Sequence, residues 1–203
     1  DLSRTQKVHL LELLNELDER LRYNKLSQWF PDAGPYARAF YPKHIRFLNA
    51  GANYKERCFF GGNRTGKSTV AALELVYHLT GLYPEWWEGK RFDEPVMAWA
   101  VGDNHLTVRD ICQYILLGNA QDLGSGMIPK KLIVDYKTKM GIPNAISDVW
   151  VRHISGGVSQ LGFKSYEQGR KAFQGTAQHV IWLDEECPED VYSECLTRTM
   201  TTR

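Results

Sequence analysis

Apolar and polar residues are distributed along this chain with periods that predict helices and strands. Between residues 5 and 24, leucines recur at helical spacing among charged residues, which predicts an amphipathic helix. Its apolar stripe consists of Leu10, Leu11, Leu13, Leu14, Leu17 and Leu21. The stripe either packs on the rest of the domain, which is the commoner arrangement, or docks on a partner. Residues 29–43 mix turn formers with aromatic residues and predict an ordered loop that leads to a short helix.

The remainder of the chain alternates apolar runs with helical patterns. In chain order these predict a strand at 58–60, a helix at 68–79, a strand at 96–101, a helix at 108–117 capped by Thr107, a loop at 118–126, two strands within 148–164 joined through Gly156 and Gly157, a strand at 179–183 and a helix opened by Pro188. Strands that alternate with helices are typical of α/β proteins. We therefore expect a mostly parallel sheet with helices on both faces, preceded by an N-terminal helical segment over residues 1–40.

Length and composition limit the classes of protein that fit. The 203 residues suffice for one domain with a sizeable core, and 25 Lys plus Arg balance 24 Asp plus Glu, which argues against a basic protein that coats nucleic acid. Four widely spaced cysteines suggest neither a zinc site nor a disulfide framework. No stretch approaches eighteen apolar residues, so we expect a soluble intracellular protein without membrane contact, and the ends of the chain suggest a fragment of a longer protein.

The segment Gly61–Ser68 matches the pattern G-x-x-x-x-G-K-[ST] of a phosphate-binding loop. Its glycines permit a backbone whose N–H groups converge on phosphate oxygens at the start of a helix. Lys67 is expected to reach the terminal phosphates, and Ser68 to bind Mg²⁺. The residues expected to hold the nucleotide are Gly61, Gly62, Asn63, Arg64, Thr65, Gly66, Lys67, Ser68 and Thr69.

The apolar run at 179–183 ends in acidic residues, as expected of a buried strand that delivers a carboxylate to the edge of a parallel sheet. Asp184 is predicted to share the Mg²⁺ with Ser68. Glu185 is predicted to take a proton from, or to orient, the water that attacks the γ-phosphate. Glu186 is either a third carboxylate of the site or, as the pattern favours, an acid in the first turn of the following helix.

Hydrolysis also needs positive charge on the oxygens of the transition state. Arg64 lies inside the loop and either serves this role or pairs with a neighbouring carboxylate. Arg170 and Lys171 precede the acidic strand, where they either reach the site of a neighbouring subunit or stay solvated.

With these motifs in place, the chain resembles the ATPase domain of the large terminase subunit, the DNA-packaging motor of tailed bacteriophages. The segments that carry the resemblance are Tyr41–His44, Gly62–Ser68, Tyr83–Gly89, Gly156–Gly157, Gly162–Tyr166, Trp182–Glu186 and Leu196–Arg203. The glycine loop and the acidic strand recur across many P-loop proteins and identify the class, whereas the Trp86–Trp87 segment and the tail single out terminases.

The resemblance implies a P-loop NTPase fold of the ASCE type over residues 41–203. It implies a Mg²⁺-dependent ATPase that assembles into a ring on the procapsid and moves double-stranded DNA inward, in the cytoplasm of an infected bacterium. Its implied partners are the viral DNA, the portal protein and the small terminase subunit. The nuclease of the family would lie beyond Arg203 and is not expected in this fragment.

The chain departs from the family pattern at two places. His44 occupies the position of a glutamine that contacts adenine, and Gln174–Gly175 replaces an Arg-Gly pair suited to an arginine finger. The finger role therefore passes to Arg170, Lys171 or Arg64. Two other functions are compatible with the motifs: a helicase-like nucleic-acid motor, and an assembly module that senses nucleotide without turnover.

Overall fold

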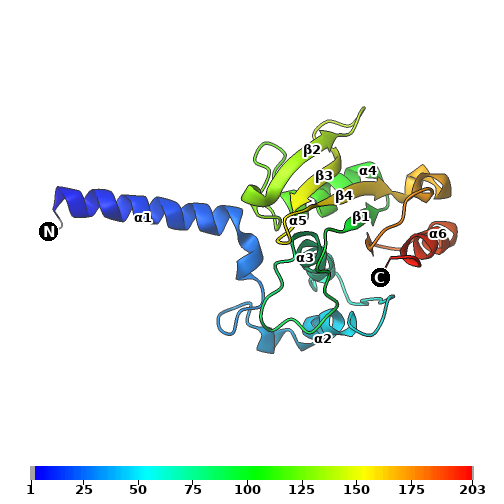
Figure 1. The fold of residues 1–203 in the computed structure, drawn as a ribbon, viewed down its shortest axis with the longest axis horizontal. Helices are drawn as coiled ribbons and strands as arrows, with labels where there is room; N and C mark the ends of the chain where they lie inside the picture. Colours follow the sequence, from blue (N-terminus) through cyan, green and yellow to red (C-terminus); the bar gives the residue numbers. More distant parts are fainter. Residues whose placement is uncertain (1–2, 203) are drawn as a thin grey trace.

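The computed structural model describes residues 3–202 (Figure 1). Its helices are α1 (Arg4–Tyr23), α2 (Pro42–Ala50), α3 (Lys67–Thr80), α4 (His105–Thr107), α5 (Tyr114–Leu117) and α6 (Glu189–Thr199). Its strands are β1 (Met97–Gly102), β2 (Ile133–Thr138), β3 (Ile146–Arg152), β4 (Val158–Ser165) and β5 (Val180–Leu183). Shorter helical turns are η1 (Lys25–Gln28), η2 (Arg38–Phe40), η3 (Val108–Gln113), η4 (Lys130–Leu132), η5 (Tyr166–Gln168) and η6 (Arg170–Phe173).

The five strands form one mixed sheet in the order β2-β3-β4-β1-β5. β1 lies between β4 and β5 and pairs in parallel with both. β3 pairs antiparallel with β2 and with β4. The expectation of a mostly parallel sheet is therefore wrong, because β2, β3 and β4 follow one another through short connections, and only antiparallel strands can be joined in that way.

Side chains of β1 alternate between two apolar clusters, one on each face of the sheet. Ala98 and Ala100 belong to the large core that contains α3. Trp99 and Val101 belong to a smaller cluster with Val191 of α6. Helices thus cover both faces, as the sequence predicts, and β1 is buried from both sides.

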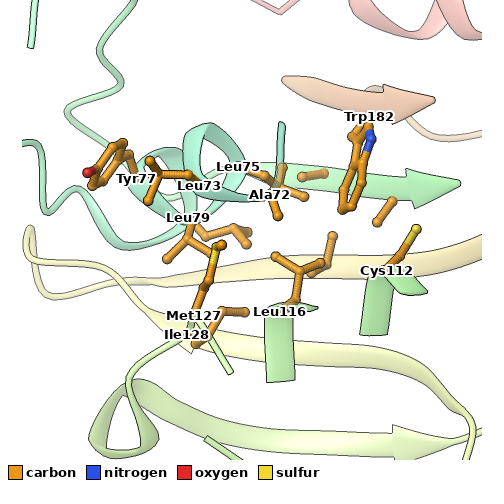
Figure 2. Packing of buried hydrophobic residues seen from close by; sticks show 14 of the residues in the cluster. Ala72, Leu73, Leu75, Tyr77, Leu79, Cys112, Leu116, Met127, Ile128 and Trp182 are labelled. Atoms are coloured by element: carbon orange, nitrogen blue, oxygen red, sulfur yellow. The ribbon is translucent and has the colours of Figure 1, made fainter. Parts of the chain in front are cut away.

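The helix α3 lies at the centre of the large core. From Val70 onward it is buried nearly all around, and residues such as Leu73 and Leu79 are fully buried. Figure 2 shows them packed with Leu116, Ile128 and Trp182 from three other parts of the chain. The first residue of this helix is Lys67, so the core fixes the position of the residues expected to bind phosphate.

The strand predicted at residues 58–60 is absent from the described structure, where this segment has no regular strand pairing. Phe59 stacks on Phe47 of α2 with ring centroids 5.1 Å apart, whereas Phe60 is 89% exposed. Nearby, the Tyr192 hydroxyl of α6 donates to Glu56 at 2.5 Å. The segment is therefore held by side-chain contacts and not by a ladder of main-chain hydrogen bonds.

The helix α1 forms as predicted, but its leucine stripe does not pack on the domain. None of its residues is buried, and the helix projects from the body of the molecule (Figure 1). At its C-terminal end, Arg22 and Tyr23 both donate to the carboxylate of Asp122. Of the two expectations for the stripe, packing on the domain is therefore wrong. Within residues 3–202, no helix has the length and apolar character needed to span a bilayer.

The helical stretch after β1 begins earlier than predicted. The side chain of Asn104 accepts a hydrogen bond from the Thr107 N–H at 3.0 Å, so Asn104 and not Thr107 is the cap. The stretch contains α4, the π-helical turn η3 and α5 in succession. It places Cys112 and Leu116 against the core.

Candidate nucleotide-binding site

The glycine loop, residues 61–68, makes a tight turn directly ahead of α3. Gly66 has a φ of +85° and Arg64 a φ of +61°, both in the left-handed region. A Cβ atom at Gly66 would lie 3.2 Å from Nε2 of His44. That nitrogen is hydrogen bonded to the Thr65 carbonyl oxygen at 2.8 Å. The loop therefore needs glycine at position 66 both for its backbone angle and for the close approach of His44.

Lys67 folds back over the glycine loop. Its Nζ donates to the carbonyl oxygens of Gly61 at 3.0 Å and Gly62 at 2.9 Å. The Thr65 hydroxyl also donates to Gly62, at 2.8 Å. Residues 61–65 are exposed, and residues 66–69, which include Thr69, are partly buried. The ammonium group is thus held at the mouth of an open turn, where it can exchange carbonyl oxygens for those of a phosphate.

Ser68 and Asp184 lie 116 positions apart in sequence and meet in the structure. The Ser68 hydroxyl donates to Oδ1 of Asp184 at 2.9 Å. Asp184 follows β5, and its N–H donates to the Val101 carbonyl at 2.8 Å, which fixes it beside β1. This contact joins the glycine loop to the acidic strand, as the sequence predicts.

Burial is the main influence on the pKa of Asp184, which is 8% exposed. Burial raises the pKa of this carboxyl, the nearby Glu185 raises it further, and the hydrogen bond from Ser68 opposes both. A cation at this position would favour the ionised form. A hydroxyl and a carboxylate oxygen side by side are the hard donors that Mg²⁺ takes when phosphate oxygens and water supply its other ligands, so Ser68 and Asp184 fit this ion.

Glu185 follows Asp184 with an unusual backbone. Its φ is +62°, a left-handed conformation that residues other than glycine rarely adopt. Its side chain is exposed and has no hydrogen-bond or ion-pair partner among residues 3–202. The carboxylate is therefore free to accept a proton from a water molecule.

Glu186 is exposed and lies outside α6. The acids in the first turn of this helix are Glu189 and Asp190. The interpretation of Glu186 as a first-turn acid is therefore wrong.

The three cationic candidates differ in their surroundings. Arg64 is exposed and makes no ion pair within the described residues. Arg170 pairs with Glu194 of α6 at 2.9 Å, and Glu194 also takes Arg198 at 3.0 Å. Lys171 is exposed, again with no ion pair in residues 3–202. Arg170 thus joins η6 to α6 through an ion pair, whereas the side chain of Arg64 has no ion-pair partner within residues 3–202.

Sequence reasoning missed two polar contacts that support the site. The Tyr166 hydroxyl donates to the Asp184 carbonyl oxygen at 2.9 Å, out of contact with solvent. Arg57, just before the glycine loop, pairs with the buried Glu74 of α3 at 2.8 Å. The only signals were a tyrosine after a strand and a glutamate within an apolar helix, and neither position is adjacent in sequence to its partner.

The geometry defines an α/β protein with a candidate nucleotide and Mg²⁺ site where the start of helix α3 meets the end of the parallel edge strand β5. Comparison with known proteins identifies the group to which it belongs. A family described as terminase large subunit, T4likevirus-type, N-terminal, matches residues 58–203. The large terminase subunit of Salmonella phage P22 is 37% identical over 219 aligned positions, which cover 98% of this chain and 42% of that protein. No solved structure matches the chain.

The chain belongs to the large terminase subunits of tailed phages. It spans less than half the length of the P22 protein.

Proposed function

We propose that this chain is the ATP-hydrolysing domain of a terminase large subunit and that it powers the movement of double-stranded DNA into a procapsid. In this proposal, residues 41–203 form a P-loop NTPase domain of the ASCE type. The observation that carries the proposal is the 2.9 Å contact between Ser68 and Asp184. It brings the hydroxyl of a phosphate-loop motif against the carboxylate of an acidic strand, which is the arrangement that binds Mg²⁺ with nucleotide phosphates.

Each side chain has a distinct part in the proposed reaction. Lys67 leaves the carbonyls of the loop and contacts the β- and γ-phosphates. Ser68 and Asp184 would hold Mg²⁺, which would neutralise charge on the phosphates. Glu185 accepts a proton from the water whose oxygen attacks the γ-phosphorus while the bond to the ADP oxygen breaks. Arg64 stabilises the charge that spreads over the γ-phosphate oxygens.

His44 is proposed to lie beside the base of the nucleotide. Its Nε2 is already engaged with Thr65, so only the ring face and Nδ1 remain for that contact. The aromatic rings of Phe30, Tyr41 and Phe59 surround it. His44 therefore links any contact with the base to the backbone of the glycine loop.

The proposal extends to partners through the family. The P22 relative is named a large terminase subunit, and the motor function requires double-stranded DNA, a portal protein and a small terminase subunit as partners. Self-association into a ring on the procapsid, within the cytoplasm of the infected bacterium, completes the proposed setting.

The test measures ATP binding by calorimetry and phosphate release with and without Mg²⁺. Lys67→Ala should weaken ATP binding by about a hundredfold, because charge-assisted contacts with several phosphate oxygens are lost. Glu185→Gln should bind ATP as the wild type does but lose turnover, because an amide cannot take a proton.

Lys131→Ala, at an exposed lysine without an ion pair in the described structure, is the matched control and should change neither quantity. Binding without any turnover in the wild type, with and without DNA, would instead identify a nucleotide-sensing assembly module. Unchanged ATP affinity in Lys67→Ala would reject the proposed site.

A further inference from the structure

The peptide that joins Asp184 to Glu185 is fixed by a side chain from another strand. The Asp184 N–H donates to Val101 of β1, continuing the parallel ladder. Within residues 3–202, no main-chain N–H donates to the Asp184 carbonyl. The Tyr166 hydroxyl takes over this role and donates to the Asp184 carbonyl at 2.9 Å.

Tyr166 is held rigidly enough to do this. It directly follows β4, is 6% exposed and packs in the smaller apolar cluster with Trp99, Val101 and Phe173. β4 pairs with β1, and β1 pairs with β5, so the tyrosine reaches across β1 to the end of β5.

Glu185 needs such support because its own conformation is unfavourable. Its φ of +62° is costly for a residue with a Cβ atom, and its exposed side chain makes no hydrogen bond within residues 3–202 that would stabilise it. The backbone of Glu185 is therefore determined by the peptide before it. A free Asp184 carbonyl would allow that peptide to rotate and Glu185 to relax.

We propose that Tyr166 is a positioning residue for Glu185: its hydroxyl fixes the peptide between Asp184 and Glu185 and so sets the direction in which the Glu185 carboxylate leaves the backbone. The inference rests on the proposed function, in which Glu185 activates water. Tyr166 itself touches neither nucleotide nor water in this scheme. Its loss should therefore lower the rate of hydrolysis and leave ATP binding intact, because a displaced base costs about ten- to a hundredfold in rate.

The experiment replaces Tyr166 by Phe, which keeps the ring in its cluster and removes only the hydroxyl. The matched control is Tyr23→Phe, which removes a hydroxyl that donates to Asp122 at 3.0 Å, where α1 meets the body of the domain. In Tyr166→Phe we expect kcat to fall by about tenfold or more while the Kd for Mg-ATP stays within about twofold. Tyr23→Phe should leave both constants unchanged.

Amide hydrogen exchange supplies a readout that does not depend on turnover. In nucleotide-free Tyr166→Phe, amides of residues 185–187 should exchange faster, while those of β3 keep their wild-type protection. Wild-type turnover in Tyr166→Phe, or unchanged exchange at residues 185–187, overturns the inference alone. A wild-type chain that binds no Mg-ATP or never hydrolyses it overturns the proposed function, and this inference with it.

Discussion

Arg57 precedes the glycine loop and Glu74 lies in the helix that follows it, so their ion pair ties the two ends of the loop together. Arg57 donates to Glu74 at 2.8 Å and to the Phe47 carbonyl at 2.8 Å. His78, one turn further along α3, lies 3.5 Å from the same oxygen of Glu74. The buried carboxylate of Glu74, with its basic neighbours Arg57 and His78, thus links the segment before the loop to the helix after it.

Glu74→Gln should lower the free energy of unfolding by about 3 kcal/mol, because the substitution leaves Arg57 largely buried without its counter-charge. Denaturant titration followed by circular dichroism measures this. Glu19→Gln, the same chemical change on the exposed α1, is the control and should stay within about 0.5 kcal/mol of the wild type. Equal stabilities of the two variants would show that the Arg57 pair contributes nothing net.

The shifted pKa of Glu74 predicts that the stability of the fold depends on pH. Burial alone raises the pKa of Glu74, but the hydrogen bonds and charges of His78 and Arg57 outweigh it, so the pKa of the folded state lies below the ordinary value of 4.5. The stabilisation is therefore present above pH 4.5 and is lost as the pH falls through the lower, folded-state pKa. The stability difference between the wild type and Glu74→Gln should shrink on acidification below pH 4.5; a difference that stays constant down to pH 2 would contradict the assignment.

At the scale of elements, the sequence predicted the helices and strands whose pattern of apolar residues is strong. The strand β1 and the helix α3 were expected, because each is buried from several sides and its sequence records that burial. The strand β5 was expected as well, but as a buried strand, whereas it lies at the edge of the sheet and is only partly buried. The strand β2 was missed: nearly all its side chains are exposed, so neither its apolar residues nor their alternation marks a buried face. Segment 58–60 was assigned a strand on apolar residues alone, although pairing depends on partners that local sequence does not contain.

The contacts of the candidate site likewise divide into those that the sequence predicts and those that it does not. The residues of the glycine loop and the meeting of Ser68 with Asp184 follow from recognised spacing. The supporting contacts of Tyr166 and Glu74 depend on which strands and helices become neighbours, and no short pattern encodes that.

The helix α1 carries a prediction about where apolar residues contribute to stability. Leu17 is 52% exposed on α1, whereas Leu73 is fully buried in α3. Leu17→Ser should change the free energy of unfolding by no more than about 0.5 kcal/mol. Leu73→Ala should cost about 2–5 kcal/mol through lost contacts and a cavity. Denaturant titration of both variants decides the point, and a large loss in Leu17→Ser would mean that the stripe packs against something in solution.

At the scale of the whole molecule, membership of the terminase family raises the question of which cation completes the site. Arg64 belongs to the glycine loop of its own chain, whereas Arg170 is joined to Glu194 on α6. For Arg170 to act on a neighbouring subunit, it would have to break its ion pair with Glu194, which is buried. Under the proposed function, Arg64 is therefore the candidate for action within its own chain, and the contact that the structure gives Arg170 is its ion pair with Glu194.

Arg64→Ala should lower basal ATP hydrolysis of this chain by about a thousandfold, the scale of an arginine that stabilises a phosphoryl-transfer transition state. Arg170→Ala should leave basal hydrolysis unchanged and lower only the thermal unfolding temperature. Phosphate-release assays and thermal denaturation of both variants test this. Full activity in Arg64→Ala would exclude its action in cis; if packaging by the full motor then fails in Arg170→Ala, the role passes to a neighbouring subunit.

The projecting helix also determines how the molecule moves through solution. A helix of 20 residues extends about 30 Å, and here it adds that length to the body of the domain (Figure 1). A compact particle of this chain length would have a radius of gyration of about 17 Å. X-ray scattering should therefore give a larger value and an asymmetric distance distribution, and frictional drag should exceed that of a sphere of equal mass. Any contact made with the leucines of α1 would therefore lie outside the body of the domain that holds the glycine loop.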